Sequence, residues 1–474
     1  MLIDFRKVLE LTEGPLKILH IGAGRKQNMG TYGDAKVTWV EANPDIPGVF
    51  HGCVSDQTGS DVVLNITDNE VSSSILTMGT HTSRYPHVKV QRTIPMKTIT
   101  IRDLSPRSYN FLNLDIQGAE MLALKGAGSD ICFFDYVYTR FYQEQTYIGA
   151  PTLEETDTFL GTFGFHRKIT QISEYNWGDA FYVREKCGII WFGTPHHGVR
   201  KSLHVLAEKT NVPFRQVSSV ADADSIPGRQ VILSFAGPFP NNHKGKVLVS
   251  GPNFHAVDYP GHNIVYNCLS SWNKKIIDHL PHYTTVAIQF PIDYDTIAPD
   301  PNIPRTKVIF YAKNRPPALI EKVLNVLVKK YGNDLIYFNY NSRYDYNHWL
   351  STLKTAKFCV LLDGSESQGF AVQEIMSTNV PLVVFDCPSW TELYPYDRDI
   401  DKYRAYTQDF SSTSVTLWDE KCGIKTTLET FEQDLGKMEK DYLSYAPRDI
   451  ILRELDCWKI IREYEKVYDE YGVK

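Results

Sequence analysis

The chain has 474 residues, a length that allows two or three domains, each with its own hydrophobic core. Hydrophobic residues make up 42% and charged residues 22% of the chain, which is typical of soluble globular proteins. The 56 acidic and 50 basic residues give a net charge of −6, so the composition gives no reason to expect a nucleic-acid partner, which would require a basic face.

Several classes of protein are disfavoured by what the chain lacks. No apolar run approaches the length of about eighteen residues that a membrane span requires, so we expect none. Residues 1–10 are charged and lack the apolar core of a signal peptide. The eight cysteines are scattered without a CxxC pair, which argues against a zinc ribbon or a disulfide framework and predicts a cytoplasmic location.

A glycine loop follows the first predicted strand. Leu16–Ile21 is apolar and runs directly into Gly22 and Gly24, and glycines let the backbone turn tightly and let a ligand approach it. The second predicted strand, 37–40, ends at Glu41, at roughly the twenty-residue spacing from which a carboxylate reaches ribose hydroxyls. Taken alone, Glu41 could equally be a solvated residue at a strand end.

A polar turn follows the third predicted element, at 52–59. Within it, Asp56 could accept a hydrogen bond from an adenine amino group, or it could simply bond its own backbone as turn aspartates do. The alternating segments 61–66 and 88–96 predict further strands.

The stretch around Asp115 organises the N-terminal part of the chain. Phe111–Leu114 predicts a buried strand, Asp115 follows it, and 121–126 predicts a short helix that Gly126 ends. A strand that carries an acid at its carboxyl end, in front of a helix, is where open α/β sheets bind their ligands. The next strand is predicted at 133–138.

The motifs of this region resemble the FkbM family of S-adenosylmethionine-dependent methyltransferases. The matching segments, in chain order, are HIGAG at 20–24, VEANP at 40–44, CVSDQTG at 53–59, FLNLDIQGAEMLALKGA at 111–127, FLGTFGF at 159–165 and WGDAFYV at 177–183. The resemblance covers about residues 15–185. It implies an α/β domain at 1–186 with the doubly wound, Rossmann-like sheet of class I methyltransferases, S-adenosyl-L-methionine as cofactor, and O-methylation, often of a sugar hydroxyl.

The resemblance also implies roles for individual residues. Gly22 and Gly24 would contact the methionine end of the cofactor, Glu41 its ribose and Asp56 its adenine, and Asp115 would face the substrate. Three positions depart from the family: many members carry Lys and Glu where this chain has Asn113 and Gln117, and members with a similar tail carry Glu where it has Arg140.

Methyl transfer to a hydroxyl requires alignment and a base. The transfer is an in-line displacement for which the protein mainly supplies positioning, and a sugar hydroxyl is a poor nucleophile until a base takes its proton. The catalytic candidates are Asp115, Glu120 and His81. Asp115 is favoured because it lies at the strand end, since an acid such as Glu120 is expected in a first helical turn for the dipole alone, and His81 could be an ordinary loop histidine.

A second α/β unit begins after residue 186. The buried segment 187–193 is followed by a loop with His196 and His197 and by a helix predicted at 201–209. Further strands are predicted at 214–217, 231–235, 247–250 and 263–267. The two histidines could contact an acceptor, but they lack further ligands at the spacing that a metal site requires, so we predict no metal.

A third unit follows the Pro-rich connector 298–304. We predict its strands at 307–311, 335–338, 358–362 and 381–385, and its helices at 318–331, through Trp349, around Glu374 and at 449–468. A basic loop carrying Lys313 and Arg315 follows the first of these strands.

Two acids in this unit, Glu366 and Glu374, resemble the E-x7-E motif of retaining GT-B glycosyltransferases, with Gly369 and Phe370 between them. SSWNKK at 270–275, followed by FPID at 290–293, is similar to the inter-domain stretch of that family. The resemblance covers about 188–474. It implies a GT-B pair of Rossmann-like domains, an acceptor-side domain at 187–300 and a nucleotide-sugar donor domain at 301–474, whose C-terminal helix returns to the first half.

The resemblance assigns Glu374 to the donor ribose, Glu366 to the donor sugar, and Lys313 and Arg315 to the diphosphate, with Gly369 and Phe370 in the same nucleotide-sugar site. Fixed cations and a helix N-terminus would stabilise the charge that develops on a leaving diphosphate. Two structural roles stay open instead: Lys313 and Arg315 could belong to a solvated loop, and Glu366 could only cap the helix.

Together the two resemblances predict a bifunctional enzyme of glycan synthesis. The first half would methylate a sugar hydroxyl, and the second would transfer a sugar from a nucleotide-sugar donor to a carbohydrate or glycoconjugate acceptor. Two alternatives stay open: the GT-B half only binds the glycan acceptor, or the methyltransferase half is inactive.

Overall fold

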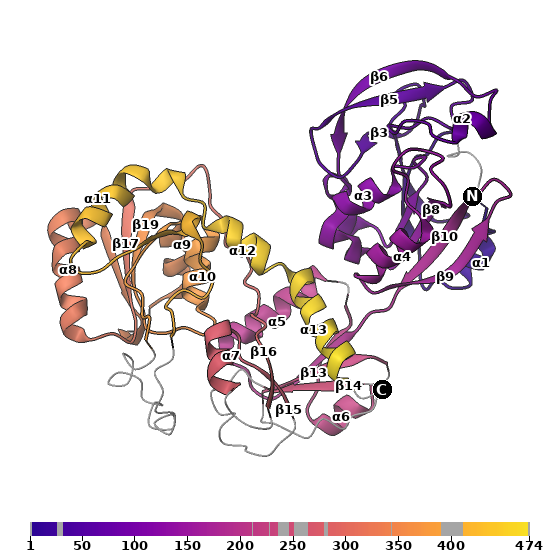
Figure 1. Cartoon of the computed structure of the whole chain (residues 1–474). Helices are drawn as coiled ribbons and strands as arrows, with labels where there is room; N and C mark the ends of the chain where they lie inside the picture. Colours follow the sequence, from indigo (N-terminus) through magenta and orange to yellow (C-terminus); the bar gives the residue numbers. More distant parts are fainter. Residues whose placement is uncertain are drawn as a thin grey trace. The chain divides into compact units, whose positions relative to one another are not determined.

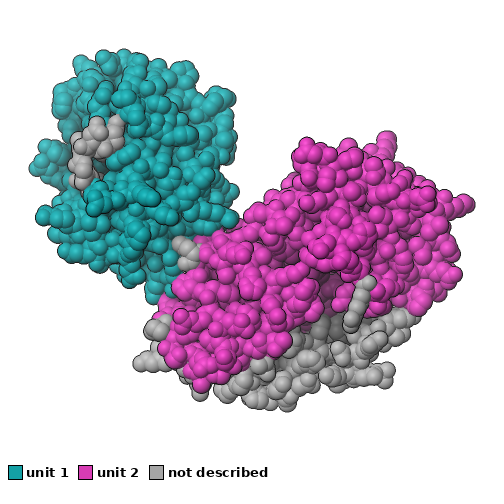
Figure 2. Space-filling model, turned by 180° about the vertical axis from the view of Figure 1, so that it is seen from behind, with its two compact units in different colours: residues 1–186 teal, residues 187–474 magenta. Residues whose placement is uncertain are grey.

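The computed structural model describes residues 2–25, 32–210, 212–226, 228–235, 246–250, 264–278, 283–342, 344–389 and 411–472. The chain divides into two compact units, Met1–Lys186 and Cys187–Lys474, which Figure 2 shows in different colours. Figure 1 labels their helices and strands.

The first unit is built on a seven-stranded sheet with the spatial order β3-β2-β1-β7-β8-β10-β9. Its strands are β1 (Lys17–Ile21), β2 (Lys36–Glu41), β3 (Phe50–His51), β7 (Phe111–Leu114), β8 (Tyr136–Tyr142), β9 (Phe165–Ile172) and β10 (Trp177–Arg184). All neighbours are parallel except β10, which is antiparallel to both β8 and β9. This doubly wound sheet confirms the predicted α/β class of the domain.

The remaining elements of this unit surround that sheet. A second sheet of three strands has the order β4-β6-β5. Its strands are β4 (Cys53–Val54), β5 (Asp61–Thr67) and β6 (Val90–Ile99); the helices are α1 (Phe5–Leu9), α2 (His81–Arg84), α3 (Glu120–Ala127) and α4 (Leu153–Gly161), with 3-10 turns η2 (Ile101–Leu104), η3 (Pro106–Ser108) and η4 (Gly128–Phe133).

The chain reverses its winding direction at β1, where β2 lies on one side and β7 on the other. Every residue of β7 is buried, and Ile18 of β1 packs with Phe111 of β7 in one apolar cluster. Two buried strands at the centre of the sheet therefore bring their carboxyl ends side by side, which is the place where such sheets bind ligands.

Two boundary predictions in this unit are wrong. Helix α3 runs past Gly126 and ends at Gly128, which has φ +55°. Gly126 is instead a site of close packing, because a Cβ there would lie 2.2 Å from the carbonyl oxygen of Ser55. Strand β8 begins at Tyr136 and not at Phe133, because 128–133 form the 3-10 turn η4.

The second unit contains two parallel sheets formed by separate stretches of chain. The first has the order β12-β11-β13-β14-β15-β16 and the second the order β18-β17-β19-β20-β21. The strands of the first are β11 (Gly188–Phe192), β12 (Phe214–Gln216), β13 (Gln230–Ser234), β14 (Lys246–Ser250), β15 (Ile264–Asn267) and β16 (Tyr283–Val286), with helices α5 (His197–Lys209), α6 (Val220–Asp224) and α7 (Ser271–Ile277).

The stretch of chain that forms the second sheet also contains longer helices. Its strands are β17 (Lys307–Ala312), β18 (Leu335–Asn339), β19 (Ala356–Leu362), β20 (Leu382–Val384) and β21 (Gly423–Lys425); the helices are α8 (Pro317–Tyr331), α9 (Tyr346–Thr355), α10 (Phe370–Ser377), α11 (Phe431–Asp441), α12 (Arg448–Glu454) and α13 (Cys457–Tyr471), with 3-10 turns η6 (Gly332–Asp334), η7 (Tyr340–Ser342), η10 (Glu420–Cys422) and η11 (Tyr442–Ser444). The all-parallel pairing of both sheets agrees with the pair of Rossmann-like folds predicted for this half.

The helix predicted at 449–468 is wrong as a single element. The structure has α12 and α13 with a break at 455–456, because the side chain of Asp456 accepts a hydrogen bond from the Lys459 backbone N–H and begins a new helix. Helix α13 packs against α5, β13 and β14 of the first sheet of this unit. Helix α5 also begins earlier than predicted, with His196 as its N-cap.

All eight cysteines are buried, and no disulfide joins any two of them. Among the described residues, no helix combines the length and the apolar composition needed to cross a membrane.

Candidate active sites

The first unit contains a cavity of about 500 Å³ at the carboxyl ends of its central strands. Gly22 and Gly24 after β1, Glu41 at the end of β2 and Asp115 after β7 all line it. Four of the residues predicted to hold the cofactor therefore meet in one place. The volume is in the range typical of small-molecule sites.

The glycine loop is required by its geometry. Gly22 has φ +87°, and a Cβ on it would lie 2.0 Å from the carbonyl oxygen of Asp115, so only glycine allows β1 and β7 to approach here. Glu41 holds the loop in place: its carboxylate accepts hydrogen bonds from the backbone N–H of Gly24 and of Asn43, both at 2.8 Å. A carboxylate has about four lone-pair sites, so Glu41 keeps acceptor capacity for a ligand.

Asp56 does not line this cavity. It is exposed, and its carboxylate accepts a hydrogen bond from the hydroxyl of Ser55. The neighbouring Cys53 and Val54 of β4 line the cavity instead. The structure places the Asp56 side chain in the turn and not in the cavity wall. Its contact with adenine stays a prediction.

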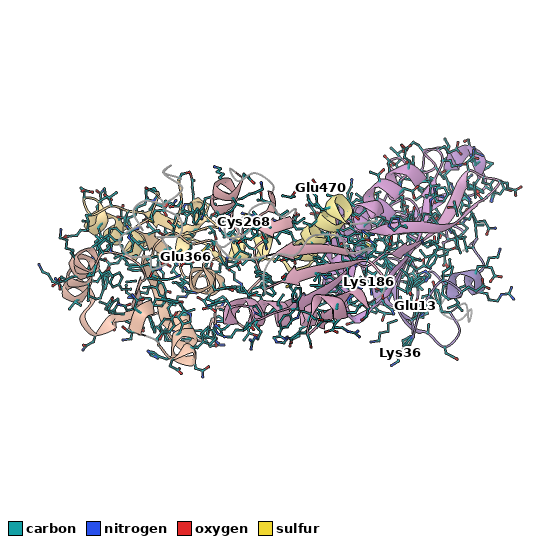
Figure 3. All side chains as sticks on the ribbon, turned by 90° about the horizontal axis from the view of Figure 1, so that it is seen from below. Glu13, Lys36, Lys186, Cys268, Glu366 and Glu470 are labelled. Atoms are coloured by element: carbon teal, nitrogen blue, oxygen red, sulfur yellow. The ribbon has the colours of Figure 1, made fainter. Side chains whose placement is uncertain are left out.

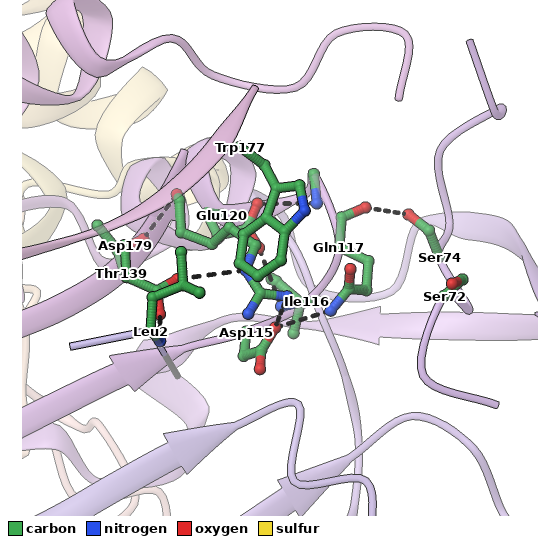
Figure 4. A network of polar contacts seen from close by, with 12 residues as sticks. Leu2, Ser72, Ser74, Asp115, Ile116, Gln117, Glu120, Thr139, Trp177 and Asp179 are labelled. Carbon is green, nitrogen blue, oxygen red and sulfur yellow. Dashed lines mark hydrogen bonds and ion pairs between the residues drawn. The ribbon is translucent and has the colours of Figure 1, made fainter. Parts of the chain in front are cut away.

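Asp115 lies in a polar network, shown in Figure 4. Its carboxylate pairs with Arg140 at 2.6 Å and accepts a hydrogen bond from the Gln117 side chain at 2.7 Å. Arg140 also contacts Asp179 at 3.3 Å and lies over the ring of Trp177, 4.4 Å from its centroid. Burial alone would lower the pKa of Arg140, but the adjacent carboxylates, Asp115 first, raise it, so it stays cationic.

Glu120 lies in the first turn of α3 but not in the cavity wall. Its carboxylate accepts hydrogen bonds from the backbone N–H groups of Ile116 and Gly118, at 3.0 and 2.8 Å. Burial raises the pKa of Glu120 to about 8. Through these contacts Glu120 stabilises the turn after β7, and its carboxylate does not face the cavity.

His81 is buried and lines the cavity. Among the described residues, no side chain or backbone group makes a hydrogen bond to its ring, and its Nδ1 is fully buried. Burial, with a smaller contribution from His87, lowers the pKa of His81, so the ring is neutral at neutral pH. Of the three predicted catalytic residues, His81 and Asp115 face the cavity and Glu120 does not.

The second unit contains a larger cavity, of about 1390 Å³. Every residue predicted for the nucleotide-sugar site lines it: Lys313, Arg315, Glu366, Gly369, Phe370 and Glu374. His196, His197 and Gly198, at the start of α5, line it as well. The cavity wall thus combines residues that follow strands of both parallel sheets, and Figure 3 labels Glu366 among them.

Lys313 and Glu366 are in direct contact, forming a largely buried ion pair. Asp363, which ends β19 and which the sequence analysis did not single out, is fully buried beside them. Burial and the charge of Glu366 raise the pKa of Asp363, while Lys313 opposes the shift. The same two acids raise the pKa of Lys313 in spite of its burial. The Arg315 guanidinium donates to the carbonyl of Asp363 at 3.3 Å.

Glu374 is held by two donors on α9. The hydroxyl of Tyr346 and the indole N–H of Trp349 each donate to one carboxylate oxygen, at 2.7 and 2.8 Å. Burial nevertheless raises the pKa of Glu374. The ammonium of Lys201 from α5 lies 3.5 Å from the centroid of the Tyr346 ring. Glu374 is therefore fixed in orientation, with the remaining lone pairs of its two oxygens available for a ligand.

Phe370 and the N-terminus of α5 are packed closely. The rings of His196 and Phe370 are stacked with centroids 6.5 Å apart, and a Cβ on Gly198 would lie 2.7 Å from the Phe370 ring. His196 accepts a hydrogen bond from the Gly198 N–H at 3.2 Å. The structure thus gives the loop histidine a capping role that the sequence did not reveal.

The chain was compared with solved structures, curated proteins and protein families. Solved structures with some likeness include S. aureus TarM in complex with fondaparinux, alpha-GlcNAc-glycerol and UDP, at 14% identity and a TM-score of 0.33 over 51% of this chain and 55% of that chain. Another is WaaG, a glycosyltransferase involved in lipopolysaccharide biosynthesis, at 11% identity and a TM-score of 0.24 over 60% of this chain and 97% of that chain. The match thus spans about half the length of TarM.

No curated protein matches the chain. The family model described as the methyltransferase FkbM domain matches residues 32–167, which include Glu41, Asp115 and Arg140. The matched segment lies wholly within the first unit.

Proposed function

We propose that this chain is a bifunctional enzyme of glycan synthesis. Its first unit would be an S-adenosyl-L-methionine-dependent O-methyltransferase acting on a sugar hydroxyl. Its second unit would be a glycosyltransferase that uses a nucleotide-sugar donor, with an acceptor-side domain at 187–300 and a donor domain at 301–474. The observation that carries the proposal is the convergence of most of the first predicted residue set, and of the whole second set, on two separate cavities.

The first cavity suits the cofactor. Gly22 lets a ligand approach the backbone without steric hindrance, Glu41 has spare acceptor capacity for ribose hydroxyls, and the acids in the wall favour a cationic group. When bound, S-adenosyl-L-methionine would supply a methyl group on a sulfonium. Asp56, which lies outside the wall, contributes to adenine binding only if the 53–59 turn moves.

The residues of the chain would prepare the acceptor hydroxyl. Asp115 is occupied by Arg140 and Gln117, and an ion-paired carboxylate is a weak base, so its role is to position the loop that follows β7. His81 is neutral and its ring has no hydrogen-bond partner among the described residues. We assign to His81 the acceptance of the hydroxyl proton at a ring nitrogen.

The second cavity suits a nucleotide diphosphate-sugar. Lys313 and Arg315 supply positive charge near the first turn of α10, where the backbone N–H groups of a helix N-terminus also favour phosphate. Glu374 is oriented for the donor ribose, and Glu366 is placed for the donor sugar. Linking the two activities would raise the effective concentration of one product at the second site if both act on one glycan.

The test is calorimetric titration of the full chain with S-adenosylhomocysteine and then with UDP, GDP, ADP, CDP and dTDP. Glu41→Gln and Glu374→Gln are the matched variants, because each keeps the size of the side chain and removes its charge. We expect each substitution to weaken only its own class of ligand. Thermal unfolding of both variants, recorded beside the titrations, separates lost binding from lost folding.

The alternatives predict different results. If the wild type binds S-adenosylhomocysteine but none of the nucleotides, the second unit is a glycan-binding module. If it binds a nucleotide alone, the first unit is inactive, and the protein is a glycosyltransferase only.

A further inference from the structure

One wall of the methyltransferase cavity, here called the aromatic wall, is a continuous set of rings. The rings of Tyr85 and His81 have centroids 4.9 Å apart, His81 and Tyr147 5.4 Å, and Tyr147 and Tyr142 5.7 Å. Trp177 joins the set through its indole N–H, which donates to the hydroxyl of Tyr85 at 3.3 Å. All five side chains line the cavity.

Three polar groups in or beside this wall have no hydrogen-bond partner among the described residues. Among the described residues, nothing makes a hydrogen bond with Nδ1 of His81, the hydroxyl of Tyr142 or the hydroxyl of Thr146, and all three atoms are buried. His81 and Thr146 are neighbours, since the backbone N–H of His81 donates to the carbonyl of Thr146 at 3.3 Å. Tyr147, in contrast, uses its hydroxyl to donate to the carbonyl of Ser72 at 3.1 Å.

Such a cluster is costly in the free protein. Each buried polar group without a partner loses its hydrogen bonds to water and gains nothing in return. One such group can be accidental, but three on residues that line the same cavity indicate that their hydrogen-bond partners are supplied by a bound molecule. These unpaired groups lower the stability of the free protein, and a bound ligand that pairs with them would restore it.

The chemistry of the wall defines the class of that molecule. Large aromatic faces favour a ring with apolar C–H faces, and the orphaned groups require hydroxyls at its edge. The charged neighbour of the wall, Arg140, is already compensated by Asp115 and Asp179, so no charge is left to attract an anion. We propose that this wall is the acceptor subsite, which binds an uncharged polyhydroxylated ring through His81, Tyr142 and Thr146.

This inference rests on the proposed methyltransferase function and names its acceptor site. The first measurement needs no ligand: thermal unfolding of Tyr142→Phe and Thr146→Val. Since each substitution removes an orphaned polar group and keeps the shape of the side chain, we expect the Tm of the first unit to rise by roughly 2–4 °C. The matched control is Tyr147→Phe, which removes a hydroxyl with a partner and should lower the Tm.

The second measurement is saturation-transfer NMR of the full chain, with S-adenosylhomocysteine present, against methyl glycosides of common hexoses and 6-deoxyhexoses. Benzyl alcohol serves as an apolar alcohol for comparison. We expect at least one glycoside to bind to the wild type, and we expect Tyr142→Phe and Thr146→Val to weaken it by several-fold to about tenfold. Affinity for S-adenosylhomocysteine should be unchanged in both variants.

Higher stability together with weaker glycoside binding in the same variant is the signature of a binding role. A lower Tm for both Tyr142→Phe and Thr146→Val would overturn the inference, because the hydroxyls would then have structural partners. Binding of benzyl alcohol without any glycoside would overturn it as well. If S-adenosylhomocysteine fails to bind the wild type, the proposed methyltransferase function itself has failed, which is a distinct result.

Discussion

Arg140 and Asp115 form an ion pair of 2.6 Å in the wall of the methyltransferase cavity, with only 11% and 5% of their side chains exposed. Arg140 is also the sole cation within reach of Asp179 in the described part of the chain. The family resemblance gave no reason to expect this pair, since related members carry an acid where Arg140 stands. Arg140 supplies the positive charge that compensates the two neighbouring carboxylates, Asp115 and Asp179.

Arg140→Met should therefore destabilise the first unit strongly. The substitution leaves Asp115 and Asp179 buried without their cation, and breaking a buried pair in this way typically costs about 3–5 kcal/mol. Differential scanning calorimetry of the full chain would report the loss as a lower Tm for the first unit. Arg140→Lys keeps the charge and loses one of the two contacts, so its effect should be smaller. Equal stability of Arg140→Met and the wild type would contradict this account.

Glu120 should make the stability of the first unit depend on pH. Burial raises the pKa of Glu120 from its ordinary value of 4.5 to about 8 in the folded state. Between these values the folded state holds one more proton than the unfolded state, so the free energy of unfolding falls as the pH rises from about 4.5 to 8. Glu120→Gln lacks this dependence. The difference between the two proteins, measured by urea denaturation at several pH values, should therefore change across this window and be flat above and below it.

Much of the fold could be predicted because its signals are local. The apolar run 111–114 and the acid after it lie in consecutive residues, as do strand 307–312 and its basic loop, and both units place these residues where expected. The wrong predictions concern the ends of individual elements, and their cause is contacts between distant segments of the chain. Gly126 lies inside a helix, and the residue there is glycine because the backbone of Ser55 lies too close for a Cβ. This contact joins segments 71 residues apart, and no periodicity in the sequence reveals it.

The site was predictable in part for the same reason. Glu41 could be singled out because it ends a predicted strand about twenty residues after the glycine loop, and Lys313 through the resemblance to GT-B glycosyltransferases. Tyr142, Thr146 and Asp363 could not be found in this way, since nothing in the sequence distinguishes them from packing residues. In the structure, the hydroxyls of Tyr142 and Thr146 have no hydrogen-bond partner among the described residues, and Asp363 is an acid buried beside an ion pair.

Two glycines of the loop after β1 should respond differently to substitution by alanine. Gly22→Ala would place a Cβ 2.0 Å from the carbonyl oxygen of Asp115, so β1 and β7 must separate and the first unit should fail to fold stably. At Gly24 no atom of the described residues lies within 4 Å of an added Cβ, and its φ of +51° is unfavourable. Gly24→Ala should fold with a cost of about 1 kcal/mol.

The measurement is a thermal unfolding profile followed by titration with S-adenosylhomocysteine. Gly24→Ala should unfold near the temperature of the wild type and bind the ligand more weakly, because Gly24 lines the cavity and the added methyl group takes up space beside the ligand. A normal Tm for Gly22→Ala would show that the close approach of β1 and β7 is not needed for the fold.

Glu366 should limit the affinity of the second cavity for nucleotides. In the structure Glu366 is paired with Lys313, so a diphosphate must compete with a carboxylate for the ammonium group. Glu366→Gln removes that competitor and keeps the size of the side chain. We expect roughly tenfold tighter binding of a nucleoside diphosphate, measured by calorimetry, together with slower sugar transfer, since Glu366 would no longer act on the donor sugar. Lys313→Met is the opposite control and should bind the nucleotide more weakly than the wild type. If Glu366→Gln bound no more tightly than the wild type, Lys313 would not contact the diphosphate, and Arg315 would be left as the cation that holds it.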